Sequence, residues 1–225
     1  SFWRLLLPGK RPDVMFLKGG FVGLPEGLVV RLFKIPYIVH ESDAVPGLAN
    51  RLLMKRAAVV ATGWSELKGV TDYTQVGIPV AAEFKMVSEA QQKNLKKAFG
   101  FDPERPLVVV TGGSQGSLNI DNAMKEILPE MLKFTSVGLV AGRKHYEDMV
   151  ELKKYEEWDK AKLKSNFRMW EFNSAMHELM GAADVVVSRA GATTIAELAA
   201  LGKAVILVPF ERLPGGHQAK NAERL

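Results

Sequence analysis

The fold is indicated most clearly by residues 183–209, which read ADVVVSRAGATTIAELAALGKAVILVP. The run ADVVVS at its start and the run AVILVP at its end are short and rich in β-branched residues, which favours buried strands. Between them, the segment 192–201 places Ile195, Leu198 and Ala199 on one stripe, so we predict a helix that packs this stripe into a core. A strand, a helix and a second strand in succession form a βαβ unit with parallel strands.

The same alternation runs along the rest of the chain. We predict nine strands, at residues 13–17, 36–41, 58–62, 75–79, 107–111, 136–141, 166–172, 183–188 and 204–209, with helices between them. In the segment 120–132 the predicted core stripe consists of Ile120, Ala123, Ile127, Leu128 and Met131. Repeated βαβ units predict an α/β protein built from doubly wound, Rossmann-like parallel sheets.

A domain boundary is expected near residue 82. Between residues 80 and 106 the pattern breaks into a polar helix bracketed by proline and glycine. Residues 1–82 then hold four predicted strands, and residues 83–225 hold five. Each of these two domains contains one Gly-Gly-x-x-Gly motif, at residues 19–23 and 112–116, after an apolar strand and before a helix. Open doubly wound domains usually have five or six strands, so we expect both domains to be incomplete.

Composition excludes several classes of protein. The chain has 225 residues, no cysteine and 47% hydrophobic residues, which is typical of a globular protein without disulfides and fits the cytosol. It has no apolar run of the roughly 20 residues that a membrane-spanning helix needs.

The net charge is +5, and residues 1–82 hold 10 Lys and Arg against 6 Asp and Glu. The chain has no dense run of basic residues of the kind that binds nucleic acid. Phe2 and Trp3, followed by basic residues, suit an anionic membrane surface or a fraying core helix about equally.

The second glycine motif, TGGSQGSLN, suits an anion. Glycines allow a sharp turn and bring bare backbone N–H groups to a helix N-terminus, where negative charge is favoured. Ser114 and Gln115 add side-chain donors. The motif has neither the lysine of a Walker A loop nor the spacing of a dinucleotide-binding loop, so it implies neither ATP hydrolysis nor NAD. A purely structural turn would also explain its glycines.

Two later segments carry further candidate ligands. The helix expected at 192–201 opens with Ala192, Thr193 and Thr194, whose free N–H groups suit a diphosphate, and Glu197 in the same helix suits a ribose diol. The segment HQAKNA carries His217, Gln218 and Asn221, which suit the hydroxyls of a sugar. Taken alone, Glu197 is also explained as a solvated helix residue, and the HQAKNA segment as the exposed polar start of a helix.

The first domain offers a cluster of acid–base groups. In IPYIVHESDAVPG, His40, Glu41 and Asp43 follow a strand at its carboxyl end, where open α/β sheets bind ligands. A carboxylate there could orient or deprotonate a hydroxyl nucleophile. The four histidines of the chain lack metal-ligand spacing, so no metal site is expected.

Five segments of the chain, by their order and spacing, resemble the MurG family. They are KGGFVGLP, IVHESDAVPGLANR, TGGSQGSLN, SRAGATTIAELAALGKAVILVPF and HQAKNA. These are peptidoglycan N-acetylglucosaminyltransferases of the two-domain GT-B fold. The resemblance covers nearly the whole chain. It implies an inverting transfer of N-acetylglucosamine from UDP-N-acetylglucosamine to the 4-hydroxyl of the muramyl sugar in lipid I, which gives lipid II and UDP without a cofactor or metal. It also implies a cytoplasmic, peripheral position on the inner face of the bacterial cell membrane.

The resemblance also assigns roles to residues. It makes 83–225 the donor-binding domain, with the donor held by Ser114, Gln115, Phe172, Ala192, Thr193, Thr194, Glu197, Gln218 and Asn221. It makes 1–82 the acceptor and membrane side, with Gly19, Gly20 and Phe21 in the acceptor site, Asp43, Glu41 and His40 as catalytic candidates, and membrane contact near Phe2 and Trp3.

The chain departs from the family at several positions. Ser42-Asp43 stands where the family commonly has Gln-Asn, Phe21 stands for a tyrosine, and Ala82 stands for an arginine that would contact phosphate. The family's first glycine loop, which carries a histidine considered as the base, would lie upstream of Ser1. Asp43 therefore indicates either a different acceptor or a direct part in deprotonation. Alternatives are another UDP-sugar glycolipid transferase, a UDP-N-acetylglucosamine epimerase and a catalytically inert nucleotide-sugar-binding fragment.

Overall fold

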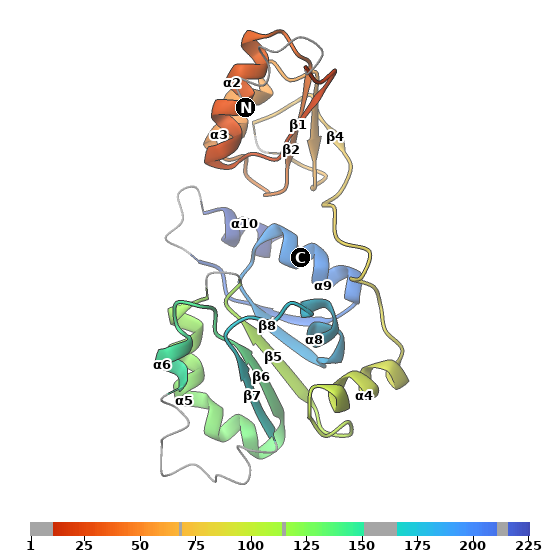
Figure 1. Ribbon diagram of the computed structural model, residues 1–225, viewed down its shortest axis with the longest axis vertical. Helices are drawn as coiled ribbons and strands as arrows, with labels where there is room; N and C mark the ends of the chain where they lie inside the picture. Colours follow the sequence, from red (N-terminus) through yellow and green to blue (C-terminus); the bar gives the residue numbers. More distant parts are fainter. Residues whose placement is uncertain (1–10, 68, 114–115, 151–165, 211–215) are drawn as a thin grey trace. The chain divides into compact units, whose positions relative to one another are not determined.

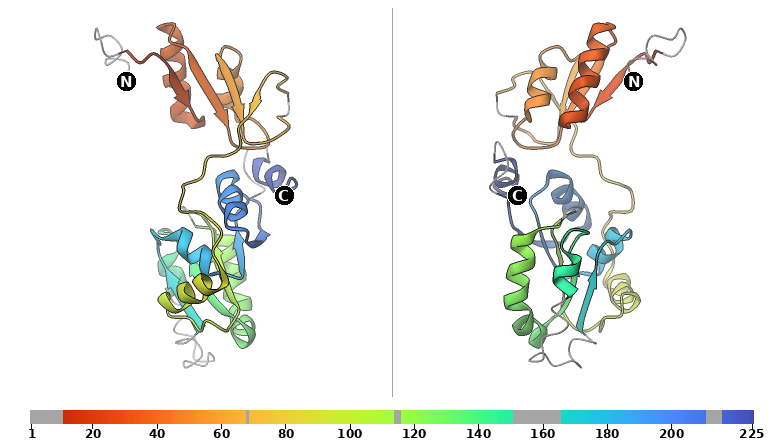
Figure 2. Two further views of the ribbon diagram at one scale, coloured as in Figure 1. Left: turned by 90° about the vertical axis from the view of Figure 1, so that its right-hand side faces the viewer. Right: turned by 60° about the vertical axis from the view of Figure 1, so that its left-hand side comes forward.

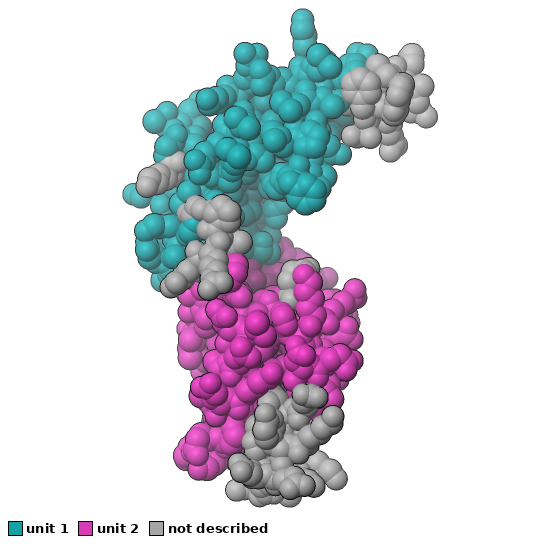
Figure 3. Space-filling view, turned by 90° about the vertical axis from the view of Figure 1, so that its left-hand side faces the viewer, with its two compact units in different colours: residues 1–79, 191–193, 211–225 teal, residues 80–190, 194–210 magenta. Residues whose placement is uncertain are grey.

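A computed structural model describes residues 11–67, 69–113, 116–150, 166–210 and 216–225. The chain forms two compact units (Figure 3), the first comprising residues 1–79, 191–193 and 211–225 and the second comprising residues 80–190 and 194–210. The division after Pro79 lies three residues before the expected boundary. At the C-terminus, residues 216–225 group by their contacts with unit 1.

Unit 2 is an open, fully parallel sheet. Its strands are β5 (Leu107–Thr111), β6 (Ser136–Val140), β7 (Phe167–Trp170), β8 (Val185–Ser188) and β9 (Ala204–Leu207). They lie in the order β7-β6-β5-β8-β9, which confirms the predicted Rossmann-like architecture. The direction of winding reverses between β5 and β8. Sheets of this kind bind ligands at the carboxyl ends of the strands beside such a reversal.

Helices cover both faces of this sheet (Figure 2). They are α4 (Glu89–Ala98), α5 (Leu118–Phe134), α6 (Tyr146–Val150), α8 (Met176–Ala182) and α9 (Ala192–Leu201). Successive residues of β5 point to opposite faces, so Val109 packs in one core with Leu179 of α8 and Leu198 of α9. Val110 packs in the other core with Leu128 of α5. Two separate cores therefore hold unit 2 together.

The core stripe predicted for α5 is partly wrong. Ile120 and Leu128 are buried as expected, but Ala123 and Ile127 are exposed and Met131 is only partly buried. The apolar residues of α5 that are buried lie along a row with a spacing of four residues: Ile120, Met124, Leu128 and Leu132. The helix packs through this ridge, as helices commonly do. In α9, Ile195 and Leu198 are buried, whereas Ala199 is exposed.

Unit 1 contains a four-stranded parallel sheet in the order β1-β2-β3-β4. The strands are β1 (Met15–Leu17), β2 (Tyr37–Glu41), β3 (Val59–Thr62) and β4 (Thr74–Gln75), and the helices are α2 (Gly20–Leu32), α3 (Leu48–Met54) and α10 (His217–Ala222). Helices α2 and α3 lie together on one face of the sheet (Figure 1), where Val30 and Leu53 pack against Leu17 and Val39. Strand β4 is shorter than predicted, since Gly77 turns the chain with φ +79°.

Candidate functional site

A cavity of about 200 Å³ opens at the carboxyl edge of the sheet in unit 2. Thr111 and Ser188, the last residues of β5 and β8, line its floor, and Gly142 lines it just beyond β6. The cavity therefore lies at the reversal in strand order, the place where sheets of this topology bind ligands.

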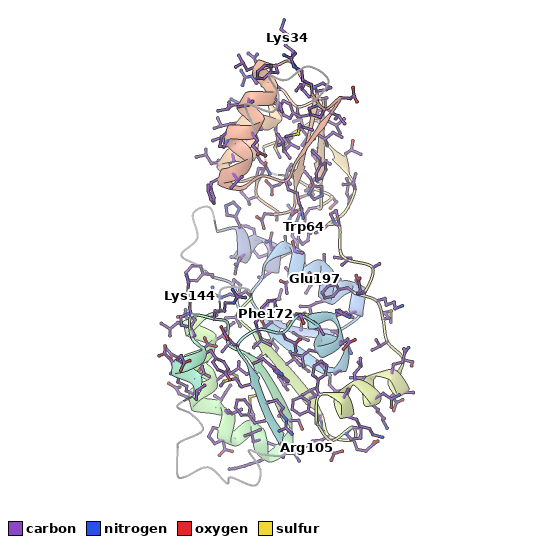
Figure 4. The ribbon with its side chains drawn as sticks, in the orientation of Figure 1. Lys34, Trp64, Arg105, Lys144, Phe172 and Glu197 are labelled. Atoms are coloured by element: carbon purple, nitrogen blue, oxygen red, sulfur yellow. The ribbon has the colours of Figure 1, made fainter. Side chains whose placement is uncertain are left out.

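Glu197 and Phe172 are brought together in the wall of this cavity (Figure 4). Glu197 lies in α9 and is partly buried, and this burial raises the pKa of its carboxyl group. The Phe172 side chain is 59% exposed, and the guanidinium carbon of Arg143 lies over its ring, 5.7 Å from the ring centre. A hydrogen-bond acceptor beside an exposed ring fits the ribose and uracil roles that the resemblance implies.

Arg189 supplies a cation to the cavity, and the sequence analysis did not single it out. Its Nε donates a hydrogen bond of 3.0 Å to Oγ of Ser117, and its guanidinium carbon lies 4.4 Å from the centre of the Phe210 ring. Burial lowers the pKa of Arg189, against the opposing effect of Asp121. Its position in the sequence could have indicated a site residue, because Arg189 comes immediately after β8 and two residues before the glycine that precedes α9.

The second glycine motif forms the turn from β5 into α5. Gly113 lines the cavity, and both Gly113 and Gly116 have positive φ, +79° and +76°, which favours glycine. Ser117 caps α5 by accepting a hydrogen bond of 3.4 Å from the backbone N–H of Ile120. The predicted ligands Ser114 and Gln115 lie outside the described residues.

The start of α9 is divided between the two units. Thr194 lines the cavity in unit 2. Ala192 is buried and Thr193 is exposed, and both residues group with unit 1, so the structure does not bring them into this cavity.

The loop after β2 is held from within by Glu41. Its Oε1 accepts a hydrogen bond of 2.9 Å from the N–H of Asp43, and its Oε2 accepts from the N–H of Gly47 at 3.1 Å and from Nδ2 of Asn50 at 2.8 Å. The side chain is buried and its carboxylate oxygens are engaged. This arrangement gives Glu41 a structural function in the loop, and the catalytic role that the sequence suggested stays a prediction.

His40 is similarly engaged. It is buried, its Nε2 lies 2.9 Å from the carbonyl oxygen of Gly77, and its Nδ1 lies 3.3 Å from Oγ of Ser42. The carbonyl can only accept, so Nε2 donates to it, while Nδ1 shares a hydrogen bond with the Ser42 hydroxyl. His40 therefore links β2 to the turn after β4.

Asp43 faces a second cavity, of about 450 Å³, which lies wholly within unit 1. Gly20 and Phe21 at the start of α2 line the same cavity, together with Lys18 and His217. Gly19 caps α2 and packs against the side chain of Asn50. The structure thus brings Asp43 together with two of the three predicted acceptor-site residues, Gly20 and Phe21.

Asn221, which is predicted to hold the sugar of the donor, lies in unit 1. Its side chain is fully buried in unit 1, where it hydrogen-bonds to Asp43 and Ala44, and it does not line the cavity of unit 2. Gln218, in the same helix, is half-buried and also lies outside that lining. The reason is the contact of α10 with the loop after β2, which no sequence pattern revealed.

The part of the chain that the structure describes contains no cluster of metal ligands and no helix that could span a membrane. No three His, Asp or Glu side chains there come close enough together to bind a metal ion. No helix there has both the length and the apolar character needed to span a bilayer. Phe2 and Trp3, the predicted membrane contact, lie outside the described residues.

Comparison with known families decides the classification. The model of the glycosyltransferase family 28 C-terminal domain matches residues 107–225, more than half of the chain, and the model of the N-terminal domain of the same family matches residues 3–62. The chain belongs to glycosyltransferase family 28. This agrees with the predicted GT-B architecture of two parallel-sheet units.

Individual relatives within family 28 are also similar over most of this chain. A protein of Carboxydothermus hydrogenoformans is 32% identical over 223 residues, and one of Lachnoclostridium phytofermentans is 35% identical; both are named UDP-N-acetylglucosamine--N-acetylmuramyl-(pentapeptide) pyrophosphoryl-undecaprenol N-acetylglucosamine transferase. The alignments cover 97% of this chain but only 58% and 59% of those relatives. The crystal structure of Acinetobacter baumannii MurG matches with a TM-score of 0.65 and 26% identity, covering 94% of this chain and 56% of that one.

Proposed function

We propose that the chain is a portion of an inverting glycosyltransferase that moves N-acetylglucosamine from UDP-N-acetylglucosamine to lipid I, giving lipid II for peptidoglycan synthesis. The observation that carries the proposal is the cavity at the carboxyl edge of unit 2, which combines the glycine turn, the Arg189 cation and the partly buried Glu197 carboxylate. The names of the family 28 relatives support the choice of donor and acceptor.

In this proposal unit 2 binds the donor. Arg189 and the N–H groups of the glycine turn balance the charge of the diphosphate, and they stabilise UDP as it leaves. Glu197 accepts hydrogen bonds from the ribose hydroxyls, and the ring of Phe172 lies against uracil.

The acceptor binds in the 450 Å³ cavity of unit 1, which Asp43 faces. The carboxylate of Asp43 takes the proton from the 4-hydroxyl of the muramyl sugar while that oxygen forms its bond to the anomeric carbon. The bond from the anomeric carbon to the diphosphate oxygen breaks, and UDP leaves with the electron pair. Attack from the face opposite the leaving group inverts the anomeric configuration.

A lipid-linked acceptor requires contact with a membrane. We propose that the chain works as a peripheral protein on the inner face of the cell membrane, with its first domain toward anionic head groups. The excess of basic residues in 1–82 supports this position. Phe2 and Trp3 would enter the interface beside these charges.

Two measurements test the proposed function. Calorimetry should detect UDP binding that is much tighter than uridine binding, because the diphosphate contacts are lost in uridine. Labelled UDP-N-acetylglucosamine should transfer its sugar to lipid I and not to diacylglycerol. Conversion of the nucleotide sugar without any acceptor would instead indicate an epimerase, and UDP binding without transfer would indicate an inert binding module. Either result would refute the proposed reaction.

A further inference from the structure

The amide side chain of Asn221 fastens helix α10 to the loop that carries Asp43. Its Nδ2 donates a hydrogen bond of 2.8 Å to Oδ1 of Asp43, and its Oδ1 accepts one of 2.8 Å from the backbone N–H of Ala44. Both groups of one amide are thus bound to two consecutive residues of the loop. Asn221 is 0% exposed, so water does not compete for these bonds.

A second residue of α10 extends this contact. Nδ1 of His217 lies 2.8 Å from the carbonyl oxygen of Val45, and because a carbonyl only accepts, Nδ1 is the donor. His217 and Asn221 are four residues apart and therefore lie on the same face of the helix. Together they bind residues 43, 44 and 45, so α10 holds this segment of the loop in one register.

Asp43 is consequently restrained at two points. Its backbone N–H is bound by Oε1 of Glu41, and Oδ1 of its side chain is bound by Asn221. Within the described ranges, no hydrogen bond reaches the other carboxylate oxygen, Oδ2, and Asp43 lines the cavity of unit 1. One oxygen is therefore anchored while the other remains available to a ligand.

We propose that Asn221 is a positioning residue that orients the Asp43 carboxylate toward the acceptor hydroxyl. The inference rests on the proposed function for the role of Asp43, and it replaces the sugar-binding role that the sequence suggested for Asn221. Holding a reactive group in place before the substrate arrives removes an entropic cost from the reaction. Asn221 does so from a helix that lies 178 residues away in sequence.

Three variants test the geometry. Asn221→Ala removes both bonds, and Asn221→Asp keeps an acceptor for Ala44 but places a second carboxylate beside Asp43. The double variant Asp43→Asn with Asn221→Asp reverses the pair, so that an amide at position 43 donates to a carboxylate at position 221. Lys220→Gln is the matched control, because it changes an exposed residue of the same helix that pairs with Glu223 at 2.6 Å.

The first readout is hydrogen exchange of the Ala44 amide in the chain without ligands. We expect exchange to be about tenfold faster in Asn221→Ala, near the wild-type rate in Lys220→Gln, and slow again in the double variant, because the reversed pair restores both bonds. Unchanged exchange in Asn221→Ala, or no recovery in the double variant, would show that no such clamp exists.

The second readout separates kcat from KM in the transfer assay. A positioning role predicts that Asn221→Ala lowers kcat by about tenfold or more while KM for UDP-N-acetylglucosamine stays within about twofold. The double variant should stay slow despite its restored loop, since it lacks the carboxylate at position 43. A raised donor KM with unchanged kcat would overturn the proposal in favour of sugar binding. A wild-type chain that transfers nothing would contradict the proposed function, and the exchange readout would still decide whether the clamp forms.

Discussion

Arg189 and Ser117 come from two different strand-to-helix connections of unit 2 and are joined by a hydrogen bond of 3.0 Å from Nε to Oγ. The same hydroxyl oxygen accepts a hydrogen bond from the N–H of Ile120 and so caps α5. The cation that lines the cavity is therefore anchored at the end of the glycine turn. A guanidinium held in this way is oriented before a ligand arrives, and this reduces the entropy lost on binding.

Replacing Arg189 with glutamine should weaken UDP binding by about tenfold to a hundredfold, because charge-assisted hydrogen bonds contribute roughly 1.5–3 kcal/mol. Uridine, which lacks the diphosphate, should bind the variant and the wild type equally. Calorimetry with both ligands separates the two cases. Lys133→Gln, in the last turn of α5, removes an exposed cation that pairs with Glu130 and should leave both affinities unchanged. An equal loss for UDP and uridine would show that Arg189 maintains the fold of the cavity instead.

Replacing Glu197 with alanine should weaken UDP by about tenfold and should weaken 2′-deoxy-UDP much less. In the proposed donor site the partly buried carboxylate would accept hydrogen bonds from ribose where little water is present, so water would not compensate for their loss. Titration of UDP and 2′-deoxy-UDP against the wild type and the variant gives four binding free energies. The thermodynamic cycle that they form isolates the contact of Glu197 with the ribose hydroxyl. Glu130→Gln, an exposed change on α5, is the control. Unchanged UDP affinity in Glu197→Ala would exclude this residue from the donor site.

Strand positions were predictable here because buried parallel strands form short apolar runs whose ends are marked by glycine and polar residues. Eight of the nine predicted strands are present at their predicted positions, whereas β4 (Thr74–Gln75) overlaps the predicted range 75–79 at Gln75 alone. The five strands of unit 2 lie in a Rossmann-like order. Glu197 and Phe172, which the resemblance assigns to the donor site, both line one cavity of unit 2, and their roles there stay predictions.

The missed features depend on contacts between distant segments. Arg189 looks like any surface arginine until the structure shows it beside Ser117, 72 residues earlier in the chain. The sequence of α10 likewise gives no sign that Asn221 binds the loop at Asp43. The stripe predicted for α5 included Ile127 because more than one row of apolar residues fits the period of a helix. Packing against β6 determines which of these rows is buried.

Replacing Asp121 with asparagine should stabilise the protein near neutral pH. This side chain is 1% exposed, and burial raises its pKa from 3.8 to about 6, although interactions with His145, the Ser117 backbone, Lys125 and Arg189 act in the opposite direction. As pH rises from about 4 to 6, the unfolded chain releases this proton and the folded chain retains it, so the stability of the wild type falls.

The asparagine variant lacks this titration. Its stability relative to the wild type should therefore increase by about 2 kcal/mol between roughly pH 4 and pH 7, as measured by urea unfolding at each pH. Glu126→Gln, an exposed carboxyl group on the same helix, gives the baseline for a surface charge. A difference between Asp121→Asn and the wild type that does not change with pH would show that this carboxyl group finds a partner in solution.

Replacing Gly116 with alanine should destabilise unit 2 more than replacing Gly113 with alanine. Both glycines have positive φ, +76° and +79°, so either change imposes a similar backbone strain of about 1 kcal/mol or more.

The two glycines differ in their surroundings. A Cβ at Gly116 would collide with the carbonyl oxygen of Ala141 and with the ring of His145, whereas a Cβ at Gly113 meets no atom of the described residues within 4 Å. Urea unfolding of the two variants therefore isolates the packing effect, since the strain common to both cancels in the comparison. If the two variants lost equal stability, the turn would have room to move away from Ala141, and it would not be the rigid support for Arg189 that the hydrogen bond to Ser117 indicates.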